Sequence, residues 1–454
     1  MHLLNHTDEP ELIDALDRRN LLTEVAQIVA ESEAPHVFGV HGDWGSGKTS
    51  FLRQLKDYLE QNGAKVEPKR KKAPETYEHL TVVWFEAWRY QYEATPIIAL
   101  LHEMRSHFTL LTKSGEAFKK LGEVGIRGLL RTFTELSLTI ATVGVKFGNI
   151  AEKVQAEGEK WEDDHLAVAL PTEKIRRFLE TSIHQLLGGD ATEKKKLRRL
   201  VVIVDDLDRC EGEAVVRFLE GIKIYLNLKS CVFVLGINQT EIQRAVAYHL
   251  LDEGRNGVLT DEAKARALGY VDKICTFTWK LPILTSKQKT EYTKKLLDKT
   301  VLSHAFQEAV AGVVDKYDCL PANPRKVKAF VNTVLHIVRA WNAQKIDQQL
   351  DVDKATAICL VALFHLFHPV QLRYLQSYPD FFEHLRRDAL KGFSDTKDDR
   401  KPMEPTHKFN EEGTVATPLF VDPADSRFCR SQRMIVEAKI TDAELRPFYG
   451  LVPS

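Results

Sequence analysis

The stretch from Gly42 to Thr49, which reads G-D-W-G-S-G-K-T, constrains the fold of this chain more than any other feature. It matches G-x-x-x-x-G-K-[ST], the pattern of a loop whose backbone N–H groups surround phosphate oxygens. The pattern has this meaning when a buried strand precedes it and a helix follows. The preceding run, His36–Val40, is typical of a buried strand, and the residues that follow have apolar side chains at helical spacing, namely Phe51, Leu52, Leu55 and Leu59. The sequence therefore predicts a phosphate-binding loop and a nucleotide site.

Each part of this loop has an expected role. Lys48 would reach the β- and γ-phosphates, and the hydroxyl of Thr49 would hold Mg²⁺. The start of the following helix would add partial positive charge. We assign nucleotide binding to the whole loop, which consists of Gly42, Asp43, Trp44, Gly45, Ser46, Gly47, Lys48, Thr49 and Ser50.

A second acidic motif, D-D-L-D-R, follows the continuous apolar run Leu200–Val204. Such a run is typical of a strand that is buried on both faces of a parallel sheet. We expect Asp205, at the tip of the strand, to supply the hard oxygen ligand that Mg²⁺ needs. Asp206 would orient or deprotonate the attacking water. Two interpretations remain open for Asp208: it caps the next helix, or it activates water in place of Asp206.

Strands alternate with helical segments, which predicts an α/β fold with a doubly wound parallel sheet. Further strands are expected at Thr81–Phe85, Cys231–Ile237 and Ile274–Trp279, and helices before the first strand at Glu11–Leu16 and Leu21–Ala30. After Pro282 the pattern is helical, and Asn323-Pro324 suits the N-cap and first position of a helix.

The 454 residues are enough for two or three domains. We divide them into a core domain at residues 1–285, a helical lid at 286–380 and a C-terminal extension at 381–454 with no assigned role. A helical insertion, at about residues 95–195, would separate the two phosphate-site motifs.

Taken in order, these motifs resemble the KAP family of P-loop NTPases. The resemblance is carried by Gly42–Thr49, Val82–Tyr90, Val201–Arg209, Val232–Asn238, Tyr270–Pro282 and Asn323–Lys328. It implies an ATPase core of the ASCE type, with a polar sensor residue after the strand that follows the acidic motif, and a second sensor on a helical lid. Asn238 and Arg325 stand at these two positions. The chain departs from the family at Glu86, where many members have Asn, and it lacks the signal for paired transmembrane helices.

The longest candidate for a membrane span, Leu129–Ile150, is interrupted by charged residues. Its uncharged part is only about half of the roughly 20 residues needed to cross a bilayer. We expect a soluble helix here, with an interfacial helix as the alternative. The N-terminus lacks the pattern of a secretory signal, and the six cysteines are scattered without a pairing pattern. These features predict a cytoplasmic protein with buried thiols.

The net charge of −1 gives no general attraction to nucleic acid. Two basic runs, Lys65–Lys72 and Lys194–Arg199, are expected to be loops, and either could contact nucleic-acid phosphates. Solvated loops are the simpler interpretation.

These inferences predict an ATPase that binds Mg-ATP and hydrolyses it slowly by in-line attack of water on the γ-phosphate. The resemblance implies a prokaryotic defence (antiphage) or signalling role, in which the nucleotide state drives homo-oligomeric assembly or a partner effector encoded nearby. Two alternatives remain: a switch or scaffold that uses ATP without turnover, and an ATPase motor that nucleic acid stimulates.

Overall fold

In the computed structural model, the chain divides into two units. The sheet unit contains Leu12–Asp14 and Arg18–Leu281, and the helical unit contains Met1–Glu11, Ala15–Asp17 and Pro282–Ser454. The structure describes residues 5–32, 34–62, 79–93, 96–112, 198–225, 228–250, 261–344, 352–378, 381–387 and 434–453, together with single residues between 176 and 187.

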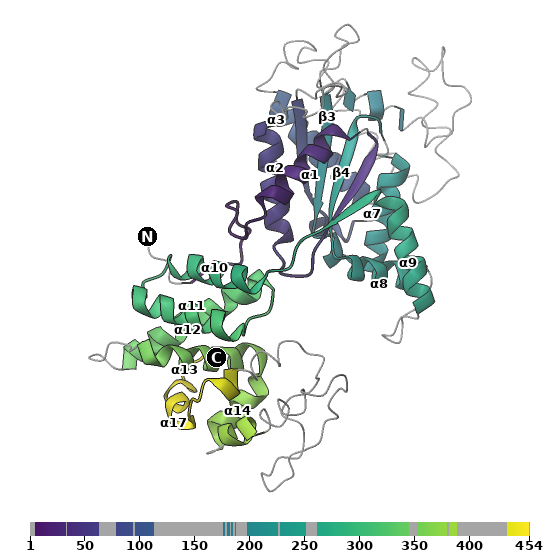
Figure 1. Ribbon diagram of the computed structural model, residues 1–454. Coiled ribbons are helices and arrows are strands. Elements are labelled where there is room, and N and C mark those ends of the chain that lie inside the picture. Colours follow the sequence, from purple (N-terminus) through teal and green to yellow (C-terminus); the bar gives the residue numbers. More distant parts are fainter. Residues whose placement is uncertain are drawn as a thin grey trace, which may run out of the picture. The chain divides into compact units, whose positions relative to one another are not determined.

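The sheet unit is built on five parallel strands, in the order β2-β3-β4-β1-β5 (Figure 1). The strands are β1 (His36–His41), β2 (His79–Glu86), β3 (Arg198–Asp205), β4 (Cys231–Ile237) and β5 (Phe277–Lys280). Because β4 lies between β1 and β3, one strand separates the strand that leads to the phosphate-binding loop from the strand that carries the acidic motif. The predicted doubly wound parallel sheet is confirmed.

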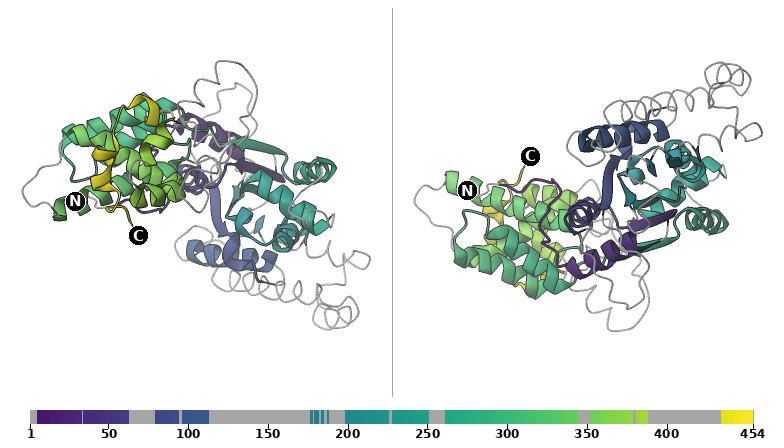
Figure 2. Two further views of the ribbon diagram at one scale, coloured as in Figure 1. Left: turned by 90° about the horizontal axis from the view of Figure 1, so that it is seen from below. Right: turned by 90° about the horizontal axis from the view of Figure 1, so that it is seen from above.

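Helices cover both faces of this sheet (Figure 2). They are α1 (Arg19–Glu31), α2 (Lys48–Asn62), α3 (Pro96–Thr112), α7 (Gly212–Tyr225), α8 (Gln239–Leu250) and α9 (Asp261–Ile274). Successive side chains of a strand point to opposite faces, so β3 contributes Val201 and Ile203 to the core beneath α1 and α2. Its other residues, Val202 and Val204, pack in the core with α3 and α7. The apolar run in β3 is therefore buried on both faces, as predicted.

The expected helix at Glu11–Leu16 is wrong. These residues form bends, and α1 begins only at Arg19. A carboxylate oxygen of Asp14 accepts the backbone N–H of Arg18 at 2.7 Å, and Asp17 adopts a left-handed conformation with φ of 56°. Local side-chain bonds of this kind compete with helix formation.

Two other expectations need correction. The fifth strand begins at Phe277, because α9 continues through Ile274. The basic run before the acidic motif is not entirely a loop: its last two residues begin β3. Arg199 is 2% exposed and donates to the carbonyl of Ser32, so this guanidinium belongs to the core of the sheet unit.

The helical unit has one core, which is formed by α10 (Ser286–Leu297), α11 (His304–Tyr317), α12 (Pro324–Gln344), α13 (Ala355–Phe367) and α14 (Pro369–Ser377). Residues after 380 join the same core through Phe382, Leu385, Met434 and Phe448. The grouping therefore differs from the predicted boundaries at 285 and 380. The predicted start of α12 is observed: Asn323 Oδ1 accepts the N–H of Lys326 at 3.3 Å, and Pro324 is the first helical residue.

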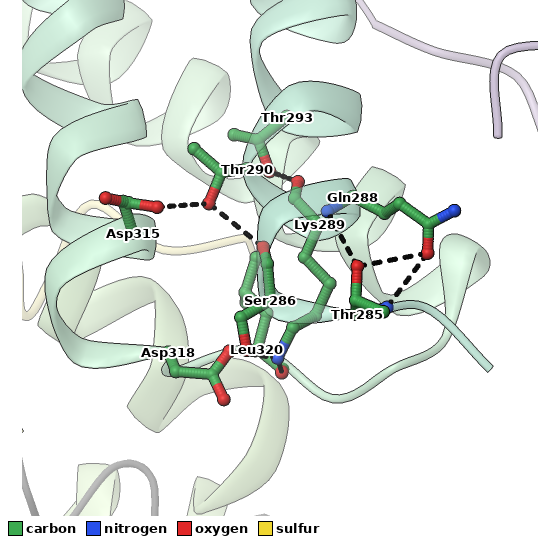
Figure 3. Close-up of polar contacts among 9 residues, drawn as sticks. All are labelled: Thr285, Ser286, Gln288, Lys289, Thr290, Thr293, Asp315, Asp318 and Leu320. Atoms are coloured by element: carbon green, nitrogen blue, oxygen red, sulfur yellow. Dashed lines mark hydrogen bonds and ion pairs between the residues drawn. The ribbon is translucent and has the colours of Figure 1, made fainter. Parts of the chain in front are cut away.

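A buried lysine fixes the connection between α11 and α12 (Figure 3). Lys289 is 2% exposed, and its Nζ donates to the carbonyl of Leu320 at 2.7 Å and pairs with Asp318. Thr290, the residue after Lys289, donates through Oγ1 to Asp315 at 3.2 Å. These contacts tie α10 to the end of α11 and to the loop that leads into α12. A buried cation is tolerated here because it is paired and hydrogen-bonded.

The candidate span Leu129–Ile150 and most of the predicted insertion lie outside the described residues. Within the part of the chain that the structure describes, we find no helix with the length and apolar character needed to cross a membrane.

Candidate nucleotide site

The phosphate-binding loop joins β1 to α2. Gly45 and Gly47 have φ of 79° and 87°, a conformation that residues with a Cβ rarely adopt. A Cβ on Gly42 would lie 2.5 Å from Ser46 Oγ, so the loop folds tightly upon itself at this point. The backbone N–H of Ser46 donates to the carbonyl of Asp43 at 3.0 Å. The loop conformation therefore favours glycine at positions 45 and 47, where φ is positive, and leaves little room for a side chain at Gly42.

Lys48 is held by the acidic motif. Its Nζ lies 2.6 Å from Asp208 Oδ2 and donates to the carbonyl of Gly42 at 3.3 Å. Both side chains are almost completely buried, with 8% and 6% exposed for Lys48 and Asp208. Asp208 is thus the partner of the loop lysine, which neither interpretation of this residue had anticipated. A phosphate bound in the loop would compete with Asp208 for the same amine.

Asp205 ends β3 beside the start of α2. Its side chain is 1% exposed, and the hydroxyl of Thr49 is hydrogen-bonded to it. Burial, assisted by the charge of Asp206, raises the pKa of the Asp205 carboxyl to about 6, although the bond from Thr49 opposes the shift. Among the described residues, no hydrogen-bond partner reaches Asp205 Oδ1. A buried, unpartnered carboxylate oxygen beside a hydroxyl fits a hard divalent cation such as Mg²⁺.

Asp206 has a left-handed backbone, with φ of 56°. This conformation is uncommon for a residue with a side chain, although Asp tolerates it better than most. Its carboxylate lies 2.9 Å from Arg209 Nε. Burial raises the pKa of the Asp206 carboxyl, and the charge of Arg209 opposes that shift.

Asn238 directly follows β4, the strand between β1 and β3. It is 9% exposed, and its Oδ1 accepts the N–H of Thr240 at 3.1 Å, which caps α8. This bond uses the acceptor oxygen of the amide, and Nδ2 is the group that could donate to a phosphate oxygen. Its position at the sheet edge between the two motifs agrees with the predicted sensor, whose role stays a prediction.

Arg325 lies in the helical unit, whereas the other predicted site residues lie in the sheet unit. It is the second residue of α12, and its Nε lies 2.8 Å from Asp8 Oδ2. Its role as a second sensor stays a prediction.

Sequence reasoning missed three polar residues around the loop and the acidic motif. Arg18 is 5% exposed and donates through Nη1 to the carbonyl of Ser46 at 2.9 Å. His41 Nδ1 accepts the N–H of Gln239 at 2.9 Å. Glu86 is in register with Asp205 at the ends of β2 and β3. Only Glu86 carried a signal, its departure from the family pattern, and none of its contacts could be predicted from that.

Two arginines surround the Glu86 carboxylate. Arg53 of α2 has an Nη2 at 3.6 Å from it, and Arg89 pairs with it through Nε. Arg53 also lies over the ring of Trp84, with 5.4 Å from Cζ to the ring centroid. Glu86 therefore links the end of β2 to the helix that follows the phosphate-binding loop.

The pKa of Asp205 has a consequence for stability. The pKa of this carboxyl rises from its ordinary value of 3.8 to about 6 in the folded protein, so stability is lost as the pH rises through this window. A shift of this size corresponds to about 3 kcal/mol. Asparagine does not ionise, so it avoids this loss. In the absence of metal and nucleotide, we therefore expect the free energy of unfolding of Asp205→Asn, relative to that of the wild type, to rise by about 3 kcal/mol between pH 4 and pH 7.5. Urea unfolding of both proteins at the two pH values measures this difference, and a pH-independent difference would contradict it.

The fold and the site together define the class: the protein is a nucleotide-binding P-loop NTPase. The sequence model described as the KAP family P-loop domain matches residues 18–341, and the chain belongs to this family. No curated protein sequence matches the chain.

Solved structures of the Aeropyrum pernix ORC2 protein are similar to the chain at 11% sequence identity. The structure described as ADPNP-ADP complexes has a TM-score of 0.38, with 86% of this chain and 78% of that chain covered. The ADP form has the same TM-score, with 88% and 79% covered.

Proposed function

We propose that the protein binds Mg-ATP and hydrolyses it to ADP and phosphate. The observation that carries the proposal is the meeting of Thr49 and Asp205, where a buried carboxylate oxygen lies without a partner beside the first turn of α2. Mg²⁺ held by these two oxygens would neutralise charge on the β- and γ-phosphates.

Each residue of the site has a task in this reaction. Lys48 exchanges Asp208 for the phosphates, and the loop N–H groups hold their oxygens. Asp206 accepts a hydrogen bond from water and orients it in line with the bond that breaks. Asn238 donates from Nδ2 to the γ-phosphate or to that water. Catalysis on this account comes from positioning and charge neutralisation.

Phosphate release from ATP tests the proposal directly. We expect slow release with ATP and Mg²⁺, and none when EDTA replaces Mg²⁺. Phosphate release at the background rate, at all protein concentrations, would overturn hydrolysis. Nucleotide binding under the same conditions would then favour the switch or scaffold. Strong stimulation by single- or double-stranded nucleic acid would favour the motor.

The wider role is proposed from family membership: a cytoplasmic defence or signalling ATPase whose nucleotide state controls homo-oligomeric assembly or a partner effector. Arg325 is our candidate for the link between turnover and assembly. An arginine in the first turn of a helix gains nothing from the helix dipole, whose positive end lies there. A planar guanidinium can grip phosphate oxygens in a bidentate way.

We expect Arg325→Ala to bind ATP with near-native affinity and to lose turnover and ATP-dependent oligomerisation together. The loss of one charge-assisted contact in the transition state predicts a kcat lower by roughly 10- to 100-fold. Steady-state turnover and sedimentation with and without ATP provide the measurements. The exposed Lys326 of the same helix turn offers a matched control, since Lys326→Ala removes one positive charge nearby. Normal turnover and assembly by Arg325→Ala would contradict the proposed sensor role of Arg325.

A further inference from the structure

Arg18 contacts the phosphate-binding loop although it is not part of it, and both belong to the sheet unit. The residue is only 5% exposed, and its Nη1 donates to the carbonyl of Ser46 at 2.9 Å. Burial lowers the pKa of the Arg18 guanidinium, and the charge of Asp14 opposes that shift. Burying a cation costs free energy that its hydrogen bonds must offset, so the loop carbonyl accepts a charge-assisted bond at a position that water hardly reaches.

The backbone of Arg18 is fixed at the start of α1. A carboxylate oxygen of Asp14 accepts its N–H at 2.7 Å, and its carbonyl accepts the N–H of Leu22 at 2.9 Å. Helix α1 belongs to the same core as α2, to which they contribute Val25 and Leu55. The guanidinium therefore reaches the loop from a rigid element.

The bond from Arg18 acts on the peptide group that joins Ser46 to Gly47. The peptide groups on either side of it are held by other bonds. On one side, the N–H of Ser46 donates to the carbonyl of Asp43 within the loop at 3.0 Å. On the other side, the carbonyl of Gly47 accepts the N–H of Phe51 at 3.0 Å, which ties it to α2. The bond from Arg18 fixes the peptide group between these two.

The orientation of this peptide group decides what the loop offers to a phosphate. In a trans peptide the C=O and the following N–H point in opposite directions, so a Ser46 carbonyl directed at Arg18 turns the N–H of Gly47 to the other side. Gly47 has φ of 87°, and glycine adopts positive and negative φ about equally readily, so a reversal of the peptide costs little locally. The reversed peptide would present a carbonyl oxygen where the loop needs an N–H donor.

We propose that Arg18 is a positioning residue, which holds the peptide between Ser46 and Gly47 with its N–H directed at the phosphates of the bound nucleotide. The inference rests on the proposed nucleotide site and adds the group that sets one of its donors. It needs no contact between Arg18 and the nucleotide. The effect of Arg18 should therefore fall on the binding of the phosphates and not on that of the base or the ribose.

The test is calorimetric titration of Arg18→Met with Mg-ATP and, separately, with Mg-tripolyphosphate, with Arg19→Met as the matched control. Methionine keeps an unbranched stem and removes the charge and the donors. Arg19 is exposed and begins α1, so its replacement removes the same charge one residue further along. We expect Arg18→Met to lower the affinity for both ligands by the same factor, about 10- to 100-fold, because a charge-assisted bond is lost. Arg19→Met should bind both ligands within about twofold of the wild type, since an exposed charge contributes little.

A second variant, Arg18→Lys, tests the inference even if Arg18→Met fails to fold. It keeps a cationic donor but lacks the planar fork of arginine, so we expect a smaller loss of affinity, about 3- to 10-fold for both ligands.

The amide of Gly47 reports the orientation of the peptide without any nucleotide. In protein that carries isotope-labelled glycine, we expect its NMR resonance to move or to split in both Arg18 variants and to stay in place in Arg19→Met. Loss of one resonance in Gly47→Ala identifies the signal. A Gly47 resonance that is unchanged in the Arg18 variants would overturn the inference, even if their free energy of unfolding is lower.

The titrations can overturn the inference in three further ways. These are wild-type affinity for tripolyphosphate in the Arg18 variants, a loss confined to ATP, which would place Arg18 at the base or the ribose, and an equal loss in Arg19→Met. Failure of the proposed function is distinguishable, because it appears in the wild type itself as the absence of nucleotide binding or of phosphate release.

Discussion

Lys48→Ala is expected to lower the affinity for ATP on the order of 10²- to 10³-fold. A charge-assisted hydrogen bond contributes about 1.5–3 kcal/mol, and the lysine is expected to make such contacts with both the β- and the γ-phosphate. The variant also leaves Asp208 without its partner in a position where its side chain is only 6% exposed. An unpaired carboxylate beside the triphosphate repels it. Calorimetric titration with ATP and Mg²⁺ measures the loss, and wild-type affinity would contradict the assignment of the loop.

Asp208→Asn is the matched control for that experiment. It removes the negative partner of Lys48 and leaves the amine in place. Because the amine then no longer has to leave a buried ion pair, we expect ATP affinity equal to or above that of the wild type. An affinity loss as large as that of Lys48→Ala would show that Asp208 itself belongs to the nucleotide site.

Asp206→Asn is expected to keep ATP binding and to lose turnover on the order of 10²- to 10⁴-fold, which is the usual contribution of a positioned acid or base. The amide keeps the size of the side chain but cannot accept a proton. Single-turnover hydrolysis and nucleotide titration of the same preparation separate the two effects. ATP-dependent assembly that persists in this variant would favour the nucleotide switch over an ATPase cycle.

Asp205→Asn should show the opposite behaviour, with weakened Mg²⁺-dependent binding of ATP. Comparing the two variants tests which carboxylate does which task, since the two aspartates are neighbours and each is replaced by an amide of the same size. If Asp205→Asn keeps Mg²⁺-dependent binding and Asp206→Asn loses it, the ligand and the water-orienting residue are exchanged.

The strands and the phosphate-binding loop could be predicted because their signals are local. Buried parallel strands such as β3 and β4 have continuous apolar runs, and the loop needs glycine where φ is positive, as at Gly45 and Gly47. The start of α12 was predictable for the same reason, since Asn323 and Pro324 act through backbone groups within one turn. The order of the motifs shared with the family added the two predicted sensor positions, Asn238 and Arg325.

What escaped prediction depends on residues far apart in the sequence. The bond from Arg18 to Ser46 spans 28 positions, and the pair of Lys48 with Asp208 spans 160. Local propensity and hydrophobic periodicity carry no information about contacts between residues so far apart in the sequence. The bends at residues 11–16 were missed because apolar spacing suggested a helix there, whereas the carbonyls of Ala15 and Leu16 accept bonds from side chains of α10 instead.

The pairing of residues 5–11 with α12 also has a consequence for synthesis. Asp8 leaves the ribosome 317 positions ahead of Arg325. At about 5–20 residues per second, this interval lasts roughly 15–60 s. All five strands of the sheet unit, the last of which ends at Lys280, are synthesised before α12. Residues 5–11 are made first of all, long before the helix that they contact. The contacts of residues 5–11 with α12 can therefore form only after α12 has been synthesised.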